Sequence, residues 1–259
     1  MRISATIITL NEEKNLRRAC ESLREIADEI IVVDSQSQDC TREVALEFTP
    51  HVFMHPFKSY SEQKNLAASK ASHPWILSID ADECLSDGLK QSLLGLKSGP
   101  AGAEVAAYRF ARRANYLGGW IQHSGWYPDY KIRLYDRNRA RWVGEYVHET
   151  LVVDGPVESL PGELLHYTVL SISDHVSRLD RYTTLAARQS ASVGKRFSLM
   201  NCLLAPPLTF LKSYFLQGGL LDGWRGLSIA AFASWYVFLK QVKLREIQNS
   251  DRVLPGSNP

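Results

Sequence analysis

The sequence lacks several features that would assign it to common classes of protein. Its four cysteines are scattered through 259 residues and form no C-x-x-C pair, which argues against a zinc or redox motif. We expect free thiols, as in a reducing compartment. Neither G-x-G-x-x-G nor a Walker loop is present. Their absence disfavours dinucleotide-dependent dehydrogenases and P-loop enzymes.

Strong charge and long apolar runs are also missing. The formal net charge is +2, which is too small to indicate a nucleic-acid partner. No signal peptide is predicted, because polar residues interrupt residues 3–10 and two glutamates follow. The longest apolar run, residues 227–239, is shorter than the roughly 20 residues that a spanning helix needs. We therefore expect a cytoplasmic protein.

The most informative stretch is an apolar segment, residues 75–79, that runs directly into Asp80, Asp82 and Glu83. Such a run is typical of a buried parallel strand, and ligands gather where these strands end. Along an extended backbone Asp80 and Asp82 would point the same way, and a divalent cation carrying phosphates would relieve their repulsion. The alternative is that Asp82 or Glu83 simply begins the next helix.

The first hundred residues alternate between strand and helix patterns. Helices are expected over 61–70, from Asp39 through Phe48, and after Asn11, which would cap the helix. Strands are expected at 3–9, 29–34, 51–55 and 75–79. This alternation predicts a parallel sheet with right-handed crossovers.

Residues 105–167 have a different composition and pattern. Short strands are expected at 105–110, 131–135, 151–153 and 163–167, around a glycine- and aromatic-rich stretch, residues 117–129. Trp120, Trp126 and Tyr127 in this stretch suit a core or a sugar ring equally. A polar helix is expected over 173–192, and Pro206-Pro207 should break the apolar stretch that follows.

Several motifs resemble those of a known enzyme family. Four motifs resemble, in order and spacing, those of the nucleotide-sugar half of inverting family-two glycosyltransferases. They are Thr9-Leu10-Asn11-Glu12, Val33-Asp34-Ser35-x-Ser37-x-Asp39-x-Thr41, Gln63-Lys64-Asn65 and Asp80-Ala81-Asp82. Five further segments resemble motifs of the bacterial branch that contains the lipopolysaccharide inner-core β-glucosyltransferases. They are Trp126-Tyr127-Pro128-Asp129, Arg133-Leu134-Tyr135, Val147-His148-Glu149, His166-Tyr167 and the tail around Gly218-Gly219-Leu220-Leu221-Asp222-Gly223. One departure is Gln36 and Gln38, where the family loop often has Gly and Ser or Thr.

The resemblance implies a GT-A fold, an α/β architecture that is Rossmann-like with a mostly parallel central sheet. A C-terminal helical extension would follow it. The expected boundaries are a glycosyltransferase domain over 1–196 and an apolar helical extension over 197–259. Within the first, residues 1–104 would form the nucleotide-sugar half and residues 105–196 the acceptor half.

The resemblance also implies a binding site for a UDP-sugar donor. Asp34 would accept a hydrogen bond from the uracil N–H, and its alternative role is to cap a turn. Lys64 would touch the diphosphate, although a lone lysine is more often solvated surface. The expected donor-binding residues are Thr9, Leu10, Asn11, Glu12, Asp34, Lys64, Asp80 and Ala81.

A metal and a general base complete the implied site. Asp82 is the main expected metal ligand, with His148 and Asp80, although a single histidine is often structural. Mixed nitrogen and oxygen ligands suit Mn²⁺ as well as Mg²⁺. Asp129 is the candidate base, with turn capping as its alternative role, and Glu149 is the second candidate.

We therefore expect an inverting, metal-dependent transferase that moves a hexose, glucose from UDP-glucose, to a lipid-linked saccharide such as the lipopolysaccharide inner core. The first alternative is a polyprenyl-phosphate glycosyltransferase, whose phosphate nucleophile needs no base. The second is a non-catalytic, membrane-associated protein that binds nucleotide sugars.

The C-terminal residues predict contact with a membrane surface. Lys240, Lys243 and Arg245 follow the apolar run, a pattern typical of helices lying on the inner face of the cytoplasmic membrane. Helices that cover the main domain, or a contact between copies in a homo-oligomer, are the alternatives. No nucleic-acid partner is expected.

Overall fold

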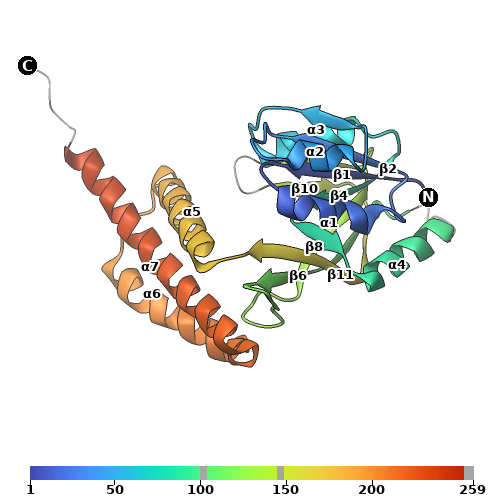
Figure 1. Cartoon of the computed structure of the whole chain (residues 1–259). Helices are drawn as coiled ribbons and strands as arrows, with labels where there is room; N and C mark the ends of the chain where they lie inside the picture. Colours follow the sequence, from blue (N-terminus) through green and yellow to red (C-terminus); the bar gives the residue numbers. More distant parts are fainter. Residues whose placement is uncertain (100–103, 145–148, 254–259) are drawn as a thin grey trace, which may run out of the picture. The chain divides into compact units, whose positions relative to one another are not determined.

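The computed structural model describes residues 1–99, 104–144 and 149–253. The chain divides into two compact units (Figure 1). The first unit comprises Met1–Arg113 and Pro128–Tyr167, and the second comprises Ala114–Tyr127 and Thr168–Pro259. This division falls at Tyr167 and groups residues 114–127 with the C-terminal part. A domain boundary at 196 stays a prediction.

The first unit is built on a nine-stranded sheet with a parallel half. Its four strands lie in the order β3-β2-β1-β4 and are all parallel. They are β1 (Ile3–Thr9), β2 (Glu29–Asp34), β3 (Val52–Met54) and β4 (Trp75–Asp80), joined by the helices α1 (Glu13–Leu23), α2 (Thr41–Leu46) and α3 (Tyr60–Ser69). The expected α/β fold with a Rossmann-like parallel half is confirmed.

The remaining strands extend the sheet beyond β4, in the order β8-β6-β11-β5. β8 pairs antiparallel with both β4 and β6, and β5 pairs antiparallel with β11. These strands are β5 (Glu83–Leu85), β6 (Ala107–Tyr116), β8 (Asp129–Asp136) and β11 (Val157–Val169), with β7 (Gly119–Trp120) paired to the end of β6. A separate hairpin joins β9 (Ala140–Val143) to β10 (Thr150–Val153).

Each face of the sheet has its own apolar core. Alternate residues of β1, β2 and β4 pack with α1, α2 and α4 (Asp87–Ser98) in one cluster, which includes Ile7, Leu16 and Leu89. The opposite face packs against α3 and the β9–β10 hairpin, through Ala68 and Trp142. Because β4 lies between β1 and β8 and is covered on both faces, it needs the unbroken apolar run that its sequence carries.

Two expectations about helix starts are wrong. Asn11 does not cap α1, which begins at Glu13. It adopts a left-handed φ of 55°, and its Oδ1 accepts a hydrogen bond from the backbone of Gln38 instead. The acidic cluster does not begin a helix either, because Glu83 lies in β5 and α4 is capped by Ser86.

The second unit is largely helical. α7 (Gly223–Val253) packs against both α5 (Ile172–Ser192) and α6 (Leu199–Leu211). Lys243 Nζ ties α7 to α5 by donating to Thr183, Thr184 and Asp180. None of the helices in the described part of the chain is both long and apolar enough to cross a membrane.

Pro206 and Pro207 do not end α6, which corrects the sequence-based expectation. Each proline removes one backbone donor from the helix, yet Pro206 is buried and α6 packs along α7. This packing offsets an intrinsic cost of about 3 kcal/mol for each proline. The helix continues into a π-helical turn, η1 (Lys212–Leu216), and then a 3-10 turn, η2 (Gly219–Asp222).

Candidate functional site

The loops after β1 and β2 are held together at the carboxyl ends of these strands. Asp34 ends β2 beside Thr9 of β1, and its Oδ1 accepts from the Ser37 N–H at 2.9 Å. Ser37 Oγ in turn accepts from the Asn11 N–H at 2.8 Å. Thr41 Oγ1 also accepts from the Glu12 N–H at 2.8 Å. These bonds form a polar cradle from residues 9–12 and 34–41.

Within this cradle Asp34 has the turn-capping role that the sequence left as its alternative. The side chain is fully buried, and both carboxylate oxygens accept from Ser37. A contact between Asp34 and uracil stays a prediction. Gln36 adopts a left-handed φ of 68°, which glycine adopts without strain. This conformation explains why the family pattern often has glycine at that position.

The Gln63-Lys64-Asn65 motif on α3 joins three parts of the first unit. Gln63 Nε2 donates to Ser35 Oγ at 2.9 Å. Asn65 pairs with the backbone of Trp142 through both its amide nitrogen and its oxygen. Lys64 points inward, with Nζ 3.1 Å from Asp80 Oδ1 and 3.3 Å from Glu149 Oε1. The alternative of a solvated Lys64 is therefore wrong, since its side chain is 2% exposed.

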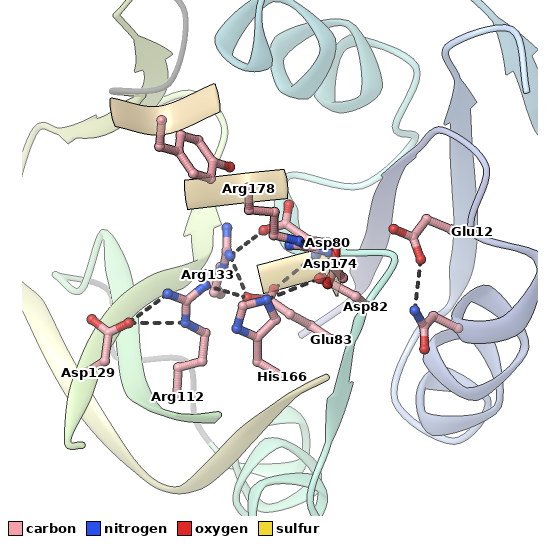
Figure 2. A network of polar contacts seen from close by, with 12 residues as sticks. Glu12, Asp80, Asp82, Glu83, Arg112, Asp129, Arg133, His166, Asp174 and Arg178 are labelled. Atoms are coloured by element: carbon pink, nitrogen blue, oxygen red, sulfur yellow. Dashed lines mark hydrogen bonds and ion pairs between the residues drawn. The ribbon is translucent and has the colours of Figure 1, made fainter. Parts of the chain in front are cut away.

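Arg133 on β8 was not predicted as a site residue, although it lies at the centre of the acidic cluster. Its Nη2 lies 2.7 Å from Asp80 Oδ2 and 2.7 Å from Glu83 Oε1 (Figure 2). Glu83 Oε2 accepts from the Asp80 N–H at 3.0 Å. Burial opposes ionisation of Asp80, but the charges of Arg133 and Lys64 outweigh it and hold its pKa well below the ordinary value. Both cations thus keep Asp80 ionised.

Asp82 has a different partner from Asp80. A two-residue turn at 81–82 ends the extended run, so strand alternation does not set the direction of Asp82. Its Oδ2 lies 3.1 Å from Nε2 of His166 on β11 (Figure 2), and its carbonyl accepts from the Tyr167 N–H. Sequence reasoning missed His166, although His166-Tyr167 carried part of the resemblance. His148 lies outside the described residues, so its role stays a prediction.

The donor set around Asp80 fits a divalent cation. Asp80 Oδ1 is buried and has the Lys64 ammonium as its partner at 3.1 Å, so a cation bound there would share this oxygen with Lys64, beside Asp82. Carboxylate oxygens with one imidazole suit Mg²⁺ or Mn²⁺. Among the residues with described positions, no group of three His, Cys, Asp or Glu side chains is close enough to hold a metal ion.

The two candidate bases belong to the same network of charges. Asp129 opens β8, where its Oδ2 lies 2.7 Å from Arg112 Nη2 and its Oδ1 lies 3.0 Å from Lys131 Nζ. Arg112 also contacts Glu83 at 3.3 Å. Ion pairs therefore join a series of residues that we call the charge network; in order of contact they are Asp129, Arg112, Glu83, Arg133, Asp80, Lys64 and Glu149. Figure 2 labels its members from Asp129 to Asp80.

The charge network affects Asp129 directly. Burial opposes ionisation of Asp129, but Arg112 and Lys131 outweigh it and hold its pKa below the ordinary value. Asp129 also lies within a strand, paired in register with Arg112. It pairs across the sheet and does not cap a turn. Glu149 is partly buried, with Lys64 as its partner.

The aromatic stretch of residues 117–127 belongs to the second unit. Trp126 packs edge-on against Tyr116, with ring centroids 5.7 Å apart. It joins a small core of Tyr116, Ile121, Val169 and Ile229. Of the two roles left open for Trp126, the structure shows packing.

Comparisons with known proteins place the chain among sugar-transferring enzymes. The family model described as Glycosyl transferase family 2 matches residues 4–152. The chain is 34% identical, over 93% of its length and 91% of the relative, to the lipopolysaccharide core biosynthesis glycosyltransferase LpsC of Rhizobium meliloti. It is 30% identical to the uncharacterized glycosyltransferase RT0209 of Rickettsia typhi, over 99% of this chain and 91% of that protein.

A solved structure supports the fold. The mannosyltransferase PcManGT of Pyrobaculum calidifontis, solved with GDP-mannose and Mn²⁺, covers 94% of this chain and 87% of its own, with a TM-score of 0.53 and 14% identity. At that identity the likeness establishes a shared fold. Together with the family match it confirms the GT-A-like architecture that the motifs predicted.

Proposed function

The chain belongs to glycosyltransferase family 2, and from this membership we propose that it is an inverting hexosyltransferase that moves glucose from UDP-glucose to a lipid-linked saccharide. The similarity to a lipopolysaccharide core glycosyltransferase along almost the whole chain supports an acceptor of the lipopolysaccharide inner-core class. The observation that carries the proposal is the charge network, which includes Asp80 at the carboxyl end of β4. In the sheet β4 lies next to β1, whose carboxyl end, with that of β2, carries the polar cradle.

On the donor side, the chain's own residues bind and orient the nucleotide sugar. The backbone of Thr9, Leu10, Asn11 and Glu12 walls the uracil ring, and Asp34 accepts from its N–H. Asp82 and Asp80 would hold a divalent cation, with His166 beside Asp82 and His148 as the further ligand. The chemistry that such a cation would supply is Lewis-acid stabilisation of the leaving diphosphate. Lys64 supplies a second positive charge toward the same phosphates.

On the acceptor side, Asp129 accepts the proton of the attacking hydroxyl. Arg112 and Lys131 keep its carboxylate ionised and fix its orientation. Attack from the face opposite the leaving group inverts the anomeric centre. Glu149 is the second candidate for this proton transfer, from the other end of the charge network.

One observation favours a second candidate function. Both candidate bases already pair with cations, Asp129 with Arg112 and Lys131 and Glu149 with Lys64. For Asp129 this pairing lowers the pKa and so makes its carboxylate a weaker base, while the cations themselves suit an anionic acceptor. A polyprenyl phosphate, which attacks without a general base, is therefore the alternative acceptor.

Calorimetry of UDP binding with and without Mn²⁺ tests the donor site. We expect tight binding to need the metal, and Asp82→Asn to lose most of that metal-assisted affinity while remaining folded. His148→Ala should also lower the metal-assisted affinity for UDP. Asp87→Asn, an exposed carboxylate on α4, is the matched control. Wild-type UDP affinity in both Asp82→Asn and His148→Ala, with metal present, would contradict the proposed site.

The donor sugar is tested in the same preparation. A thermal-shift panel of nucleotide sugars should show the largest metal-dependent rise in melting temperature with UDP-glucose, because a ligand that binds only the native state stabilises it by mass action. A larger rise with a GDP-sugar would overturn the UDP assignment. Binding without turnover on any saccharide or polyprenyl phosphate acceptor would favour a non-catalytic protein.

A further inference from the structure

Helix α6 exposes its large apolar side chains and buries its smaller ones. Leu203 and Leu208 are each 61% exposed, whereas Cys202 and Pro206 are buried. A helix that packs on a core shows the opposite pattern. The exposed residues recur at intervals of about one helical turn, as one face requires: Leu199, Met200, Leu203, Leu204, Leu208 and Leu211.

The exposed apolar surface continues along the chain into α7. Leu216 is 83% exposed and Leu221 is 72% exposed. The residues of the α6–α7 connection and the first turns of α7 that add to it are Phe215, Leu216, Leu220, Leu221, Trp224 and Leu227. We call the exposed apolar residues of α6 the α6 stripe, and the stripe together with this second set the apolar face. Twelve large apolar side chains in one stretch exceed what a monomer leaves to water without a partner.

The charges around the apolar face are almost all positive. From residue 195 to residue 245 the chain carries seven Lys and Arg residues and a single acid, Asp222. The Asp222 side chain is only 5% exposed, because it is turned toward His123. Lys195 and Arg196 precede α6 and Lys212 follows it, and all three are exposed. Lys243 is paired with Asp180, so the surface combines apolar side chains with the exposed positive charges of Lys195, Arg196 and Lys212.

We propose that the apolar face inserts into the surface of an anionic lipid bilayer, with α6 lying in the plane of the headgroups. This inference rests on the proposed function, because a lipid-linked acceptor resides in such a surface. It places the attachment site on α6 and the start of α7, and not along the whole run of residues 227–239, because within that run Ile229 and Ala230 are buried and the Phe232 ring lies 4.1 Å from that of His175. Apolar insertion flanked by Lys and Arg is the pattern of an interfacial helix.

A second copy of the chain fits this face less well. A two-fold contact would bring the same patch against itself. The positive charges around the apolar face would then meet one another, with no exposed acid between residues 195 and 245 to pair with them. An anionic bilayer presents the complementary charge and an apolar interior.

Flotation with lipid vesicles tests the proposal on the full-length protein, without donor or acceptor. We expect binding to phosphatidylcholine vesicles that contain phosphatidylglycerol, weakened but not abolished by high salt. The double substitution Leu203→Glu/Leu208→Glu should lower vesicle affinity about a hundredfold or more, from the loss of two buried leucines. Leu46→Glu/Leu94→Glu, at exposed leucines of α2 and α4, is the matched control and should bind like wild type.

The charge contribution is tested separately. Lys195→Gln/Lys212→Gln should lower affinity about tenfold or more for anionic vesicles and leave the salt-resistant part unchanged. Leu216→Glu, at the most exposed apolar position, provides a single substitution that cannot disturb packing. Circular dichroism melting of each variant confirms that the fold is retained.

The outcomes separate this proposal from the enzymatic one. UDP binding measured without vesicles should be the same in the Leu203→Glu/Leu208→Glu variant and in wild type. The membrane proposal is wrong if full-length protein does not bind anionic vesicles. It is also wrong if the stripe variant, Leu203→Glu/Leu208→Glu, binds them as well as the control variant does. Sedimentation that shows a dimer lost in the stripe variant, without vesicle binding in wild type, would assign the apolar face to a contact between copies.

Discussion

Asp129 and Glu149 lie at the two ends of the charge network, and each already has a cationic partner. Between them every carboxylate contacts an Arg or Lys within 3.3 Å. Removing one member of such a buried set costs more than an exposed pair, because the remaining charge loses its compensation. Substitutions that keep the side-chain shape are therefore the informative ones at these residues.

Asp129→Asn should lower kcat by roughly 10²–10⁴, which is the usual contribution of a positioned base, while the affinity for the donor stays near wild type. Steady-state kinetics with a saccharide acceptor measures both quantities. Glu149→Gln is the paired control. The assignment is reversed when Glu149→Gln shows this loss and Asp129→Asn does not. Normal rates in both variants would favour a phosphate acceptor.

Much of the candidate site could be predicted because parallel strands bring their ends together. Asp34 and Asp80 follow apolar runs, so their place at one edge of the sheet follows from the pattern. Arg133 and His166 could not be placed in this way. They reach the acids from β8 and β11, and nothing in a single sequence fixes the register of distant antiparallel strands.

At the scale of elements, the sequence does not determine which other elements a helix packs against. Residues 199–211 are mostly apolar, and this composition does not say which face of a helix would be covered. Tertiary packing decides that, and here it covers the face with Cys202 and Pro206. The same packing stabilises α6 with Pro206 and Pro207 inside it, although proline disfavours the interior of a helix.

The stretch of residues 122–124 depends on one side chain of the second unit. Asp222 accepts from the backbone N–H groups of Gln122 and His123 at 3.2 and 3.0 Å, and from Ser124 Oγ at 3.1 Å. Gly218 and Gly223, with φ of 71° and 62°, make the turns that bring Asp222 there. This arrangement explains the Gly218-Gly219-Leu220-Leu221-Asp222-Gly223 motif.

Asp222→Ala should lower the free energy of unfolding by about 1–3 kcal/mol, because it leaves these donors without an acceptor. Urea unfolding followed by circular dichroism measures the loss. Glu246→Ala, at an exposed position on α7, is the control and should change stability by less than about 0.5 kcal/mol. Equal stability of the two variants would mean that water replaces Asp222 without cost.

For the whole molecule, the free energy of unfolding should decrease in two steps as the pH is lowered. Burial lowers the pKa of His175, so its contribution is complete above about pH 6.5 and is lost as the pH falls below that value. Asp80 and Asp129 also have lowered pKa values, with Arg133 and Arg112 outweighing burial. Their contribution is complete above about pH 4 and disappears as the pH falls toward their folded pKa values.

Urea unfolding across a pH series measures both steps. In His175→Phe the shallow decline below about pH 6.5 should disappear, while the steep decline below about pH 4 remains. Arg112→Gln should move the acid step upward, because it removes a cation from Asp129. A wild-type protein with constant stability down to about pH 3 would contradict the assigned carboxylate pKa values.

The partner of residues 122–124 is separated from them by about a hundred positions in the chain. During synthesis on the ribosome, all nine strands of the main sheet emerge before Asp222 does. Residues 122–124 therefore acquire these hydrogen bonds only after the chain has been synthesised as far as Asp222. A chain that ended before Asp222 would contain every strand of the main sheet but would lack the acceptor for these donors.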